Sequence, residues 1–315
     1  MIRFGIYKFG IYKKSQLKNL KNLKTLLGDH KKISITLYDQ IIDEPNAEEL
    51  AEHILLEATD ERGAYKRTYA KRFESFDGTI LDHINQHFNS KNLISVHDLA
   101  VSDGRTAVGF FEKISKIFPK ISYTASDYSP NVFVIEKKPY TITISPSGKV
   151  LEILWPPFVC KPLKRDRYYS INYIISVFLQ FFIAPSILKM HKKGLLKARE
   201  LSLFAPSVLK LSKIDERFNL MQHNVLNPLS DNYNIIRAMN IFNTSYFSVD
   251  EFKIALKNVY HGLKENGFLI TGSNQDAGSL VHGGLYQKTS KGFKKLWQSG
   301  DGSPIDSMIL KAHTF

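Results

Sequence analysis

The stretch Leu93-Ile-Ser-Val-His-Asp-Leu-Ala-Val-Ser-Asp-Gly104 decides the fold of this 315-residue chain. Its first six residues, 93–98, are a short apolar run that is typical of a buried strand. The turn 98–104 leads directly into an expected helix over 105–118, whose apolar residues fall on one stripe. A second strand over 121–127 would complete a βαβ unit, and such units predict a parallel sheet.

The same pattern resumes in the second half of the chain. A capping box, Ser248-Val-Asp-Glu251, opens an expected helix that ends near Asn266-Gly267. Further strands are expected over 217–225, 233–239, 268–272, 283–288 and 293–298. The sequence therefore predicts an α/β fold with a Rossmann-like core, in which a mostly parallel sheet carries helices on both faces.

Three regions are expected from this pattern. Residues 1–90 are a basic N-terminal arm followed by a helical region, and residues 91–127 and 201–315 form the core. Residues 128–200 are an inserted cap of strands followed by an uncharged stretch, 168–188. This stretch is long enough for a transmembrane helix, but a spanning helix would separate strands that must pair. We expect buried helices that cap the ligand edge of the sheet and suit an apolar or amphipathic acceptor.

Charge is distributed unevenly along the chain. The net charge is +13, and residues 1–32 contribute +8 of it, with nine Lys and Arg against Asp29 alone. Such an arm predicts an anionic partner, either RNA or a membrane surface, although a solvated surface arm is the alternative. An N-terminal signal peptide is not evident in residues 1–12.

Cys160 is the single cysteine, so the chain cannot form an internal disulfide or a zinc site of clustered thiolates. The ten histidines show no paired ligand spacing, and we therefore expect no metal. Together with the missing signal peptide, the cysteine usage favours a reducing, cytoplasmic location.

The turn after the first strand is the expected cofactor site, because ligands of open parallel sheets bind beyond the carboxyl ends of the strands. A dinucleotide needs Gly-x-Gly-x-x-Gly, and this turn has only Gly104. Ala100 and Ser102 suit S-adenosylmethionine, which carries no phosphate. Asp98 would then orient the amino-acid end of that cofactor. Asp127 would accept both ribose hydroxyls, although its sequence context is also good turn chemistry.

These segments resemble the class I S-adenosylmethionine-dependent methyltransferases, most closely the branch that methylates chemotaxis receptors. The loop 100–104 is similar to that branch's small-residue loop, and Ala125-Ser-Asp-Tyr128 is similar to its ribose-binding turn. The stretches 218–226, 233–242 and 263–273 resemble its later core strands. About a third of the chain takes part in the resemblance.

The resemblance implies a role for each matching residue. Asp127, followed by Tyr128, would hold the ribose, while Asn224 and Val225 would frame the adenine. Met239 and Asn240 would line the methyl-donor side. Arg72 would match an arginine that the branch places before its core.

Two departures from the branch concern charge. The branch has an acid where this chain has Arg105, and it has an arginine where this chain has Met239. The nearest arginine, Arg237, lies two places earlier. These differences argue against glutamate methylation of a receptor.

The expected activity is methyl transfer to a small-molecule or peptide acceptor. In-line attack on an activated methyl can rely on proximity and orientation, and no residue is identified as a catalytic base. His97 and His223 are expected to be core histidines. The alternatives are a catalytically silent protein of this fold that binds RNA or an anionic membrane through its arm, and an RNA methyltransferase.

Overall fold

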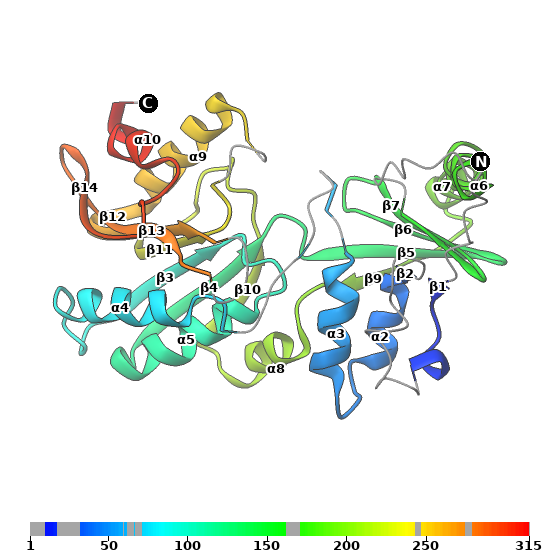
Figure 1. Ribbon diagram of the computed structural model, residues 1–315, viewed down its shortest axis with the longest axis horizontal. Helices are drawn as coiled ribbons and strands as arrows, with labels where there is room; N and C mark the ends of the chain where they lie inside the picture. Colours follow the sequence, from blue (N-terminus) through cyan, green and yellow to red (C-terminus); the bar gives the residue numbers. More distant parts are fainter. Residues whose placement is uncertain are drawn as a thin grey trace. The chain divides into compact units, whose positions relative to one another are not determined.

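The computed structural model describes residues 10–17, 32–58, 60–61, 66, 71–161, 171–242, 247–274 and 279–314. The chain divides into two compact units (Figure 1). Unit 1 comprises Met1–Arg67 and Asn131–Pro206, and unit 2 comprises Thr68–Pro130 and Ser207–Phe315. Most of the basic arm 1–32 lies outside the described residues, so its anionic partner stays a prediction.

Unit 2 is built on a seven-stranded mixed sheet in the order β10-β4-β3-β11-β12-β13-β14. The first five strands in this order run parallel, and β13 and β14 continue the sheet as antiparallel pairs. The strands are β3 (Ile94–Leu99), β4 (Ile121–Asp127), β10 (Phe218–Gln222), β11 (Tyr233–Met239), β12 (Leu263–Ser273), β13 (His282–Thr289) and β14 (Gly292–Ser299).

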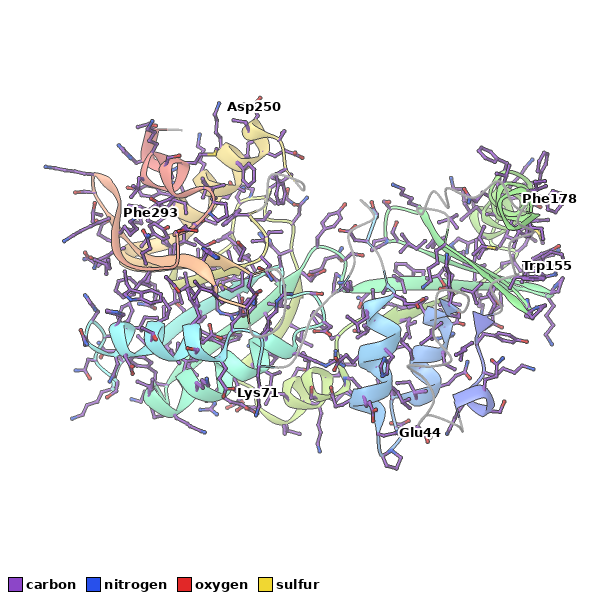
Figure 2. The ribbon with its side chains drawn as sticks, viewed as in Figure 1. Glu44, Lys71, Trp155, Phe178, Asp250 and Phe293 are labelled. Carbon is purple, nitrogen blue, oxygen red and sulfur yellow. The ribbon has the colours of Figure 1, made fainter. Side chains whose placement is uncertain are left out.

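Helices cover both faces of this sheet: α4 (Glu74–Asn85) and α5 (Arg105–Ile117) on one, α9 (Val249–Gly262) and α10 (Asp306–Leu310) on the other. Side chains that alternate along β11 pack against both layers of helices. Arg237 points to α4 and α5, while its neighbours Ile236 and Ala238 belong to a core that includes Phe252 of α9. Phe293 of β14, labelled in Figure 2, packs edge-on against Tyr260 of α9 in the same core.

Local sequence signals account for several boundaries in unit 2. The helix expected at 105–118 is α5, and the strand expected at 121–127 is β4. The capping box that opens α9 is formed: Ser248 Oγ accepts from the backbone N–H of Glu251 at 3.3 Å, and the Ser248 N–H donates to Glu251 Oε2 at 2.8 Å. The strand expected over 217–225 is shorter, because β10 ends at Gln222 and an Asx turn at Asn224 follows.

Unit 1 contains a five-stranded sheet in the order β8-β7-β6-β5-β9, and every pair is antiparallel. Its strands are β5 (Asn131–Lys137), β6 (Tyr140–Ile144), β7 (Val150–Trp155), β8 (Phe158–Cys160) and β9 (Ala198–Ser202). Its helices are α2 (Tyr38–Ile41), α3 (Ala47–Leu56), α6 (Ile171–Phe178) and α7 (Ala184–Lys192), and β1 (Gly10–Ile11) pairs with β2 (Lys32–Ile33). Helix α8 spans Pro206–Ile214.

The units differ from the expected regions at two points. The N-terminal segment shares one hydrophobic core with the insertion, in which Leu37 and Ile54 pack with Val134 and Leu151. The segment and the insertion therefore form one unit rather than two regions. Residues 68–90, expected in the N-terminal region, belong to unit 2 instead, since Asp77 of α4 binds Arg237 of β11.

The described part of the uncharged stretch, from residue 171 on, forms one continuous helical segment, in which a π-helix, Leu179–Ile183, joins α6 to α7. We expected these helices to be buried, and this expectation is wrong for their outer face. Leu179, Ala184 and Ile187 pack on the five-stranded sheet, but Phe181 and other apolar residues are exposed. Among the described residues, none of the helices has the length and apolar character needed to cross a membrane.

Candidate functional site

The carboxyl ends of five parallel strands meet at one edge of the unit 2 sheet. The chain runs outward from β3 through β4 to β10 and then returns to β11 on the other side of β3. The strand order therefore reverses between β3 and β11. In open α/β sheets the ligand crevice lies outside the carboxyl ends at this switch point, so the turns after β3, β4 and β11 form the candidate site.

The turn after β3 has an unusual backbone. Ala100, Ser102 and Gly104 have positive φ angles of 57°, 61° and 83°. Glycine adopts such angles without cost, whereas alanine and serine do so at a cost of about 1–2 kcal/mol each. Strain of this kind is concentrated at functional sites. The small residues noted in the sequence thus occupy the left-handed positions of the turn.

The turn after β3 and the acid after β4 converge. The backbone N–H of Ser102 donates to Asp127 Oδ2 at 2.8 Å, and the backbone N–H of Ser129 donates to Asp127 Oδ1 at 3.0 Å. The Asp127 carboxylate thus holds the first loop against the second strand. A carboxylate has about four acceptor positions, so it can accept from several donors at once.

Two buried hydroxyl groups belong to the serines whose backbone N–H groups bind this carboxylate. Ser102 and Ser129 each donate a backbone N–H to Asp127, yet neither Oγ has a hydrogen-bond partner within the described part of the chain. A buried polar atom without a partner costs about 1–3 kcal/mol. A polar ligand that approaches Asp127 would supply the missing partners.

The turn after β10 reaches the same edge. The backbone N–H of His223 donates to the carbonyl of Asp127 at 3.0 Å, and this contact brings Asn224 and Val225 beside the end of β4. Asn224 Oδ1 accepts from the backbone N–H of Leu226, so this side chain stabilises its own turn. Val225 is buried, and Tyr128 is among the exposed aromatic residues.

A second group of residues gathers beyond β11 and β12. Met239 is buried at the end of β11, and Asn240 follows it with φ 57°. The Asn240 amide group exchanges hydrogen bonds with Asn274: Oδ1 accepts from the Asn274 N–H at 3.0 Å, and Nδ2 donates to Asn274 Oδ1 at 3.4 Å. Arg72 donates to the same Oδ1 at 2.6 Å and to the Asn274 carbonyl at 2.9 Å. The structure therefore brings Arg72 and Asn240 together through Asn274.

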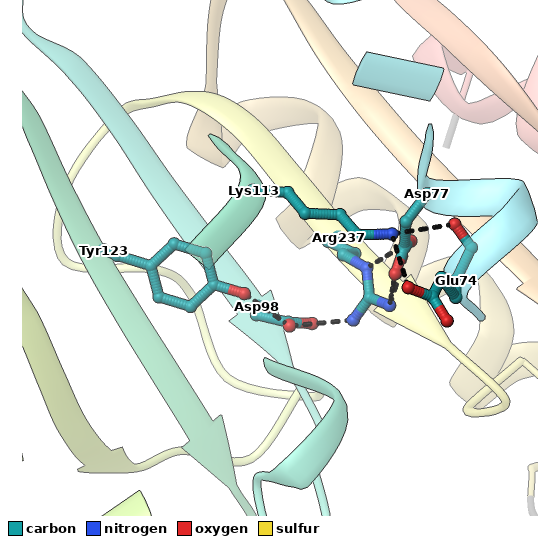
Figure 3. A network of polar contacts seen from close by, with 6 residues as sticks. All are labelled: Glu74, Asp77, Asp98, Lys113, Tyr123 and Arg237. Carbon is teal, nitrogen blue, oxygen red and sulfur yellow. Dashed lines mark hydrogen bonds and ion pairs between the residues drawn. The ribbon is translucent and has the colours of Figure 1, made fainter. Parts of the chain in front are cut away.

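Asp98 does not take the position expected for it. Its side chain is buried on the face of the sheet that α4 and α5 cover. There Oδ2 accepts from Tyr123 Oη at 2.7 Å and from Arg237 Nη1 at 2.9 Å (Figure 3). Arg237 also donates to both carboxylate oxygens of Asp77 at 3.1 Å. Asp98 thus stabilises the core behind the loop, and the amino-acid end of a cofactor has no evident partner in it.

The buried network holds two carboxylates against one guanidinium. Burial raises the pKa of Asp77 to about 6, and the neighbouring Asp98 adds to the rise, while Arg237 opposes it. Burial also raises the pKa of Asp98, against the effects of Arg237 and Tyr123. The carboxyl group of Asp77 therefore keeps its proton to a higher pH than a solvated aspartate does.

The two charge departures noted in the sequence have structural explanations. Arg105 is buried and forms an ion pair with Asp103 within the same turn. Arg237 is the largest of the fully buried side chains in the described residues and serves the network with Asp77 and Asp98.

His97 is a core residue as expected, whereas His223 is only partly buried and follows the end of β10. Burial lowers the pKa of His97 to about 3, and the nearby His223 contributes to the decrease, so His97 is neutral at physiological pH. His97 Nε2 lies 2.8 Å from Ser126 Oγ, and its ring packs against Tyr233. Within the described residues, His97 Nδ1 and His223 Nε2 lack hydrogen-bond partners, and no group of three or more His, Cys, Asp or Glu residues could hold a metal.

Asn274 and Ser129 were missed by sequence reasoning. Asn274 follows β12, and Ser129 follows β4, so both come directly after strands of the parallel sheet. Listing every polar residue within two positions of a parallel strand's end would have found them. The unpaired state of the Ser129 hydroxyl had no sequence signal, because it depends on how the turn folds.

Comparisons with known proteins are limited to folds. No family model matches this chain, and no curated protein matches it. Similar solved structures are methyltransferases, among them the methyltransferase domain of the citrinin polyketide synthase, with 11% identity, TM-score 0.36, and coverage of 76% of this chain and 42% of the other. Another is the N-methyltransferase NodS from Bradyrhizobium japonicum, with 12% identity, TM-score 0.31, and coverage of 65% and 70%.

The mitomycin 7-O-methyltransferase MmcR is similar at 10% identity and TM-score 0.29, with coverage of 76% of this chain and 43% of the other. The chain spans about half of the length of the first structures that it matches, at 47%, 42% and 57%. TM-scores this low carry no weight for the activity, which must be argued from the residues of the chain itself.

Proposed function

We propose that this protein is a class I S-adenosylmethionine-dependent methyltransferase. The contact between the Ser102 N–H and Asp127 Oδ2 is the main support, because it joins the loop after β3 to the acid after β4 at the switch point of the sheet. A nucleoside cofactor needs both at once.

The residues of the site suit this cofactor. Ala100, Ser102 and Gly104 keep the loop small, and the Asp127 carboxylate would accept the ribose hydroxyls beside the unpaired Ser102 Oγ. Asn224 and Val225 would frame the adenine. The cofactor, when bound, supplies a methyl group on a positively charged sulfur, already activated for transfer.

The protein's own contribution to methyl transfer would be to hold and orient the reactants. Asn240 is fixed through Asn274, and both it and Met239 stand at the end of β11, beside the loop of β3. These residues would line the methyl-donor side, with Arg72 near them. We propose a small-molecule or peptide acceptor, and we assign no catalytic base.

Isothermal titration calorimetry with S-adenosylmethionine and S-adenosylhomocysteine tests this proposal. The wild type should bind both, and Asp127→Ala should abolish detectable binding because the loop loses its anchor and the ribose its acceptor. Asp250→Ala removes an exposed carboxylate that pairs only with Lys253 in the described contacts, so it should bind like the wild type. Absence of binding by the folded wild type would reject the proposal.

A further inference from the structure

The helical segment of unit 1 has two apolar faces. Its inner face packs on the five-stranded sheet through Leu179, Ala184 and Ile187, opposite Ile142 and Ile153. Its outer face is formed by Ile174, Phe178, Phe181 and Phe182, which recur at helical spacing and are all exposed. A surface helix normally turns a polar face to solvent, so the outer face needs an explanation.

The exposure of aromatic residues here is exceptional for this chain. Phe181 is 69% exposed and Phe182 is 65% exposed. The three phenylalanines on the outer face are the only exposed ones among the described residues, although the chain has 21. Phe178, labelled in Figure 2, stacks on Phe182 with ring centroids 5.5 Å apart, so the rings form one continuous apolar surface.

Basic residues border this surface at its C-terminal end. Lys189, Lys192, Lys193 and Lys197 are all exposed, and Leu195, which is exposed as well, lies among them. The sequence from 171 to 197 contains no Asp or Glu. Exposed aromatic rings next to lysines, without acids, are the composition of helices that lie in the interface of anionic membranes.

A second copy of the chain suits the outer face less well than an anionic membrane does. A twofold interface places the same surface of each subunit against the other. The same segment of a second copy carries four lysines and no acid, so it offers no negative charge to complement the lysines of the first. Anionic lipid headgroups supply the missing negative charge, and the acyl region receives the rings.

We propose that the outer face of residues 171–197 binds an anionic membrane surface, with the helix lying in the plane of the interface. The rings of Phe178, Phe181 and Phe182 enter the boundary between headgroups and acyl chains, and the lysines contact the headgroups. This surface belongs to unit 1, whereas the candidate cofactor site belongs to unit 2, and the proposal does not depend on that site.

Co-sedimentation of the full chain with vesicles tests the proposal. The wild type should bind phosphatidylcholine vesicles that contain phosphatidylglycerol, and only weakly those of phosphatidylcholine alone. The variant Phe178→Ser/Phe181→Ser/Phe182→Ser should bind more than about tenfold more weakly. Lys189→Gln/Lys192→Gln should lose roughly twenty-five-fold in affinity, at about fivefold for each lysine.

A matched control replaces three exposed apolar residues elsewhere: Leu93→Ser/Ile214→Ser/Val249→Ser. It should bind vesicles like the wild type. Far-UV circular dichroism and the urea midpoint establish that each variant is folded, and Phe181→Ser alone serves if the triple variant is not.

The proposal would be overturned if the wild type did not bind anionic vesicles, or if the aromatic variant bound them as well as the wild type. It would also be overturned if the wild type were a dimer that does not bind vesicles and the aromatic variant were a monomer. None of these readouts involves the cofactor, so failure here leaves the proposed methyltransferase activity untouched.

Discussion

Arg237 Nη1 of β11 lies 2.9 Å from Asp98 Oδ2 of β3, and both side chains are buried beneath the loop that follows β3. The guanidinium also faces the ring of Phe110 at 4.9 Å. This ion pair ties two neighbouring strands to α4 and α5. It therefore fixes the platform from which the loop 100–104 extends.

Removing the guanidinium should destabilise unit 2 strongly. Arg237→Met leaves two buried carboxyl groups without their cation, and breaking a buried pair in this way costs about 3–5 kcal/mol. Urea denaturation measures the loss. Arg199→Met, which breaks an exposed pair with Asp39, should cost only about 0–1 kcal/mol. Equal effects of the two substitutions would contradict a buried network.

The pKa of Asp77 predicts a pH dependence. Its value of about 6 in the folded protein lies above the ordinary value of 3.8, so the folded state binds more protons between these pH values. Stability from this group is therefore lost as pH rises from about 4 to 6. Asp77→Asn does not titrate. The stability of the wild type relative to Asp77→Asn should fall by as much as about 3 kcal/mol between pH 4 and pH 7, measured by urea denaturation. A constant or rising difference would contradict the raised pKa.

The sequence predicted the sheet of unit 2 well and its polar network poorly. Apolar runs and a capping box define β3, α5, β4 and α9, because these signals are local. The role of Asp98 was misjudged, since it depends on which face of β3 meets α4, and α4 lies outside the βαβ pattern. The exposed face of α6 and α7 was also unforeseen, because an uncharged helix gives no sign of which side is covered.

The left-handed turn predicts a stabilising substitution. Ala100→Gly should raise the free energy of unfolding by about 0.5–1 kcal/mol, because relief of strain at φ 57° exceeds the entropy that glycine adds to the unfolded chain. Thermal unfolding of the purified protein measures the change. Ala107→Gly, in the interior of α5, should instead lose about 1 kcal/mol or more. If both substitutions destabilise alike, residue 100 is not held in a strained conformation.

The capping box at α9 can be tested with two substitutions. Ser248→Ala removes the acceptor for the Glu251 N–H and should cost about 1 kcal/mol of stability. Ser248→Gly should cost only a few tenths of a kcal/mol of stability, since glycine is itself a good N-cap residue. Chemical denaturation distinguishes the two, and the reverse order would exclude the side-chain cap.

The central claim is that the loop after β3 and Asp127 hold one nucleoside together. An experimental structure of the protein with S-adenosylhomocysteine measures this directly. The ribose hydroxyls should lie within about 3.2 Å of the Asp127 carboxylate, with Ser102 alongside. A nucleoside bound elsewhere, or packed protein side chains filling the space between residues 100–104 and Asp127, would contradict the account.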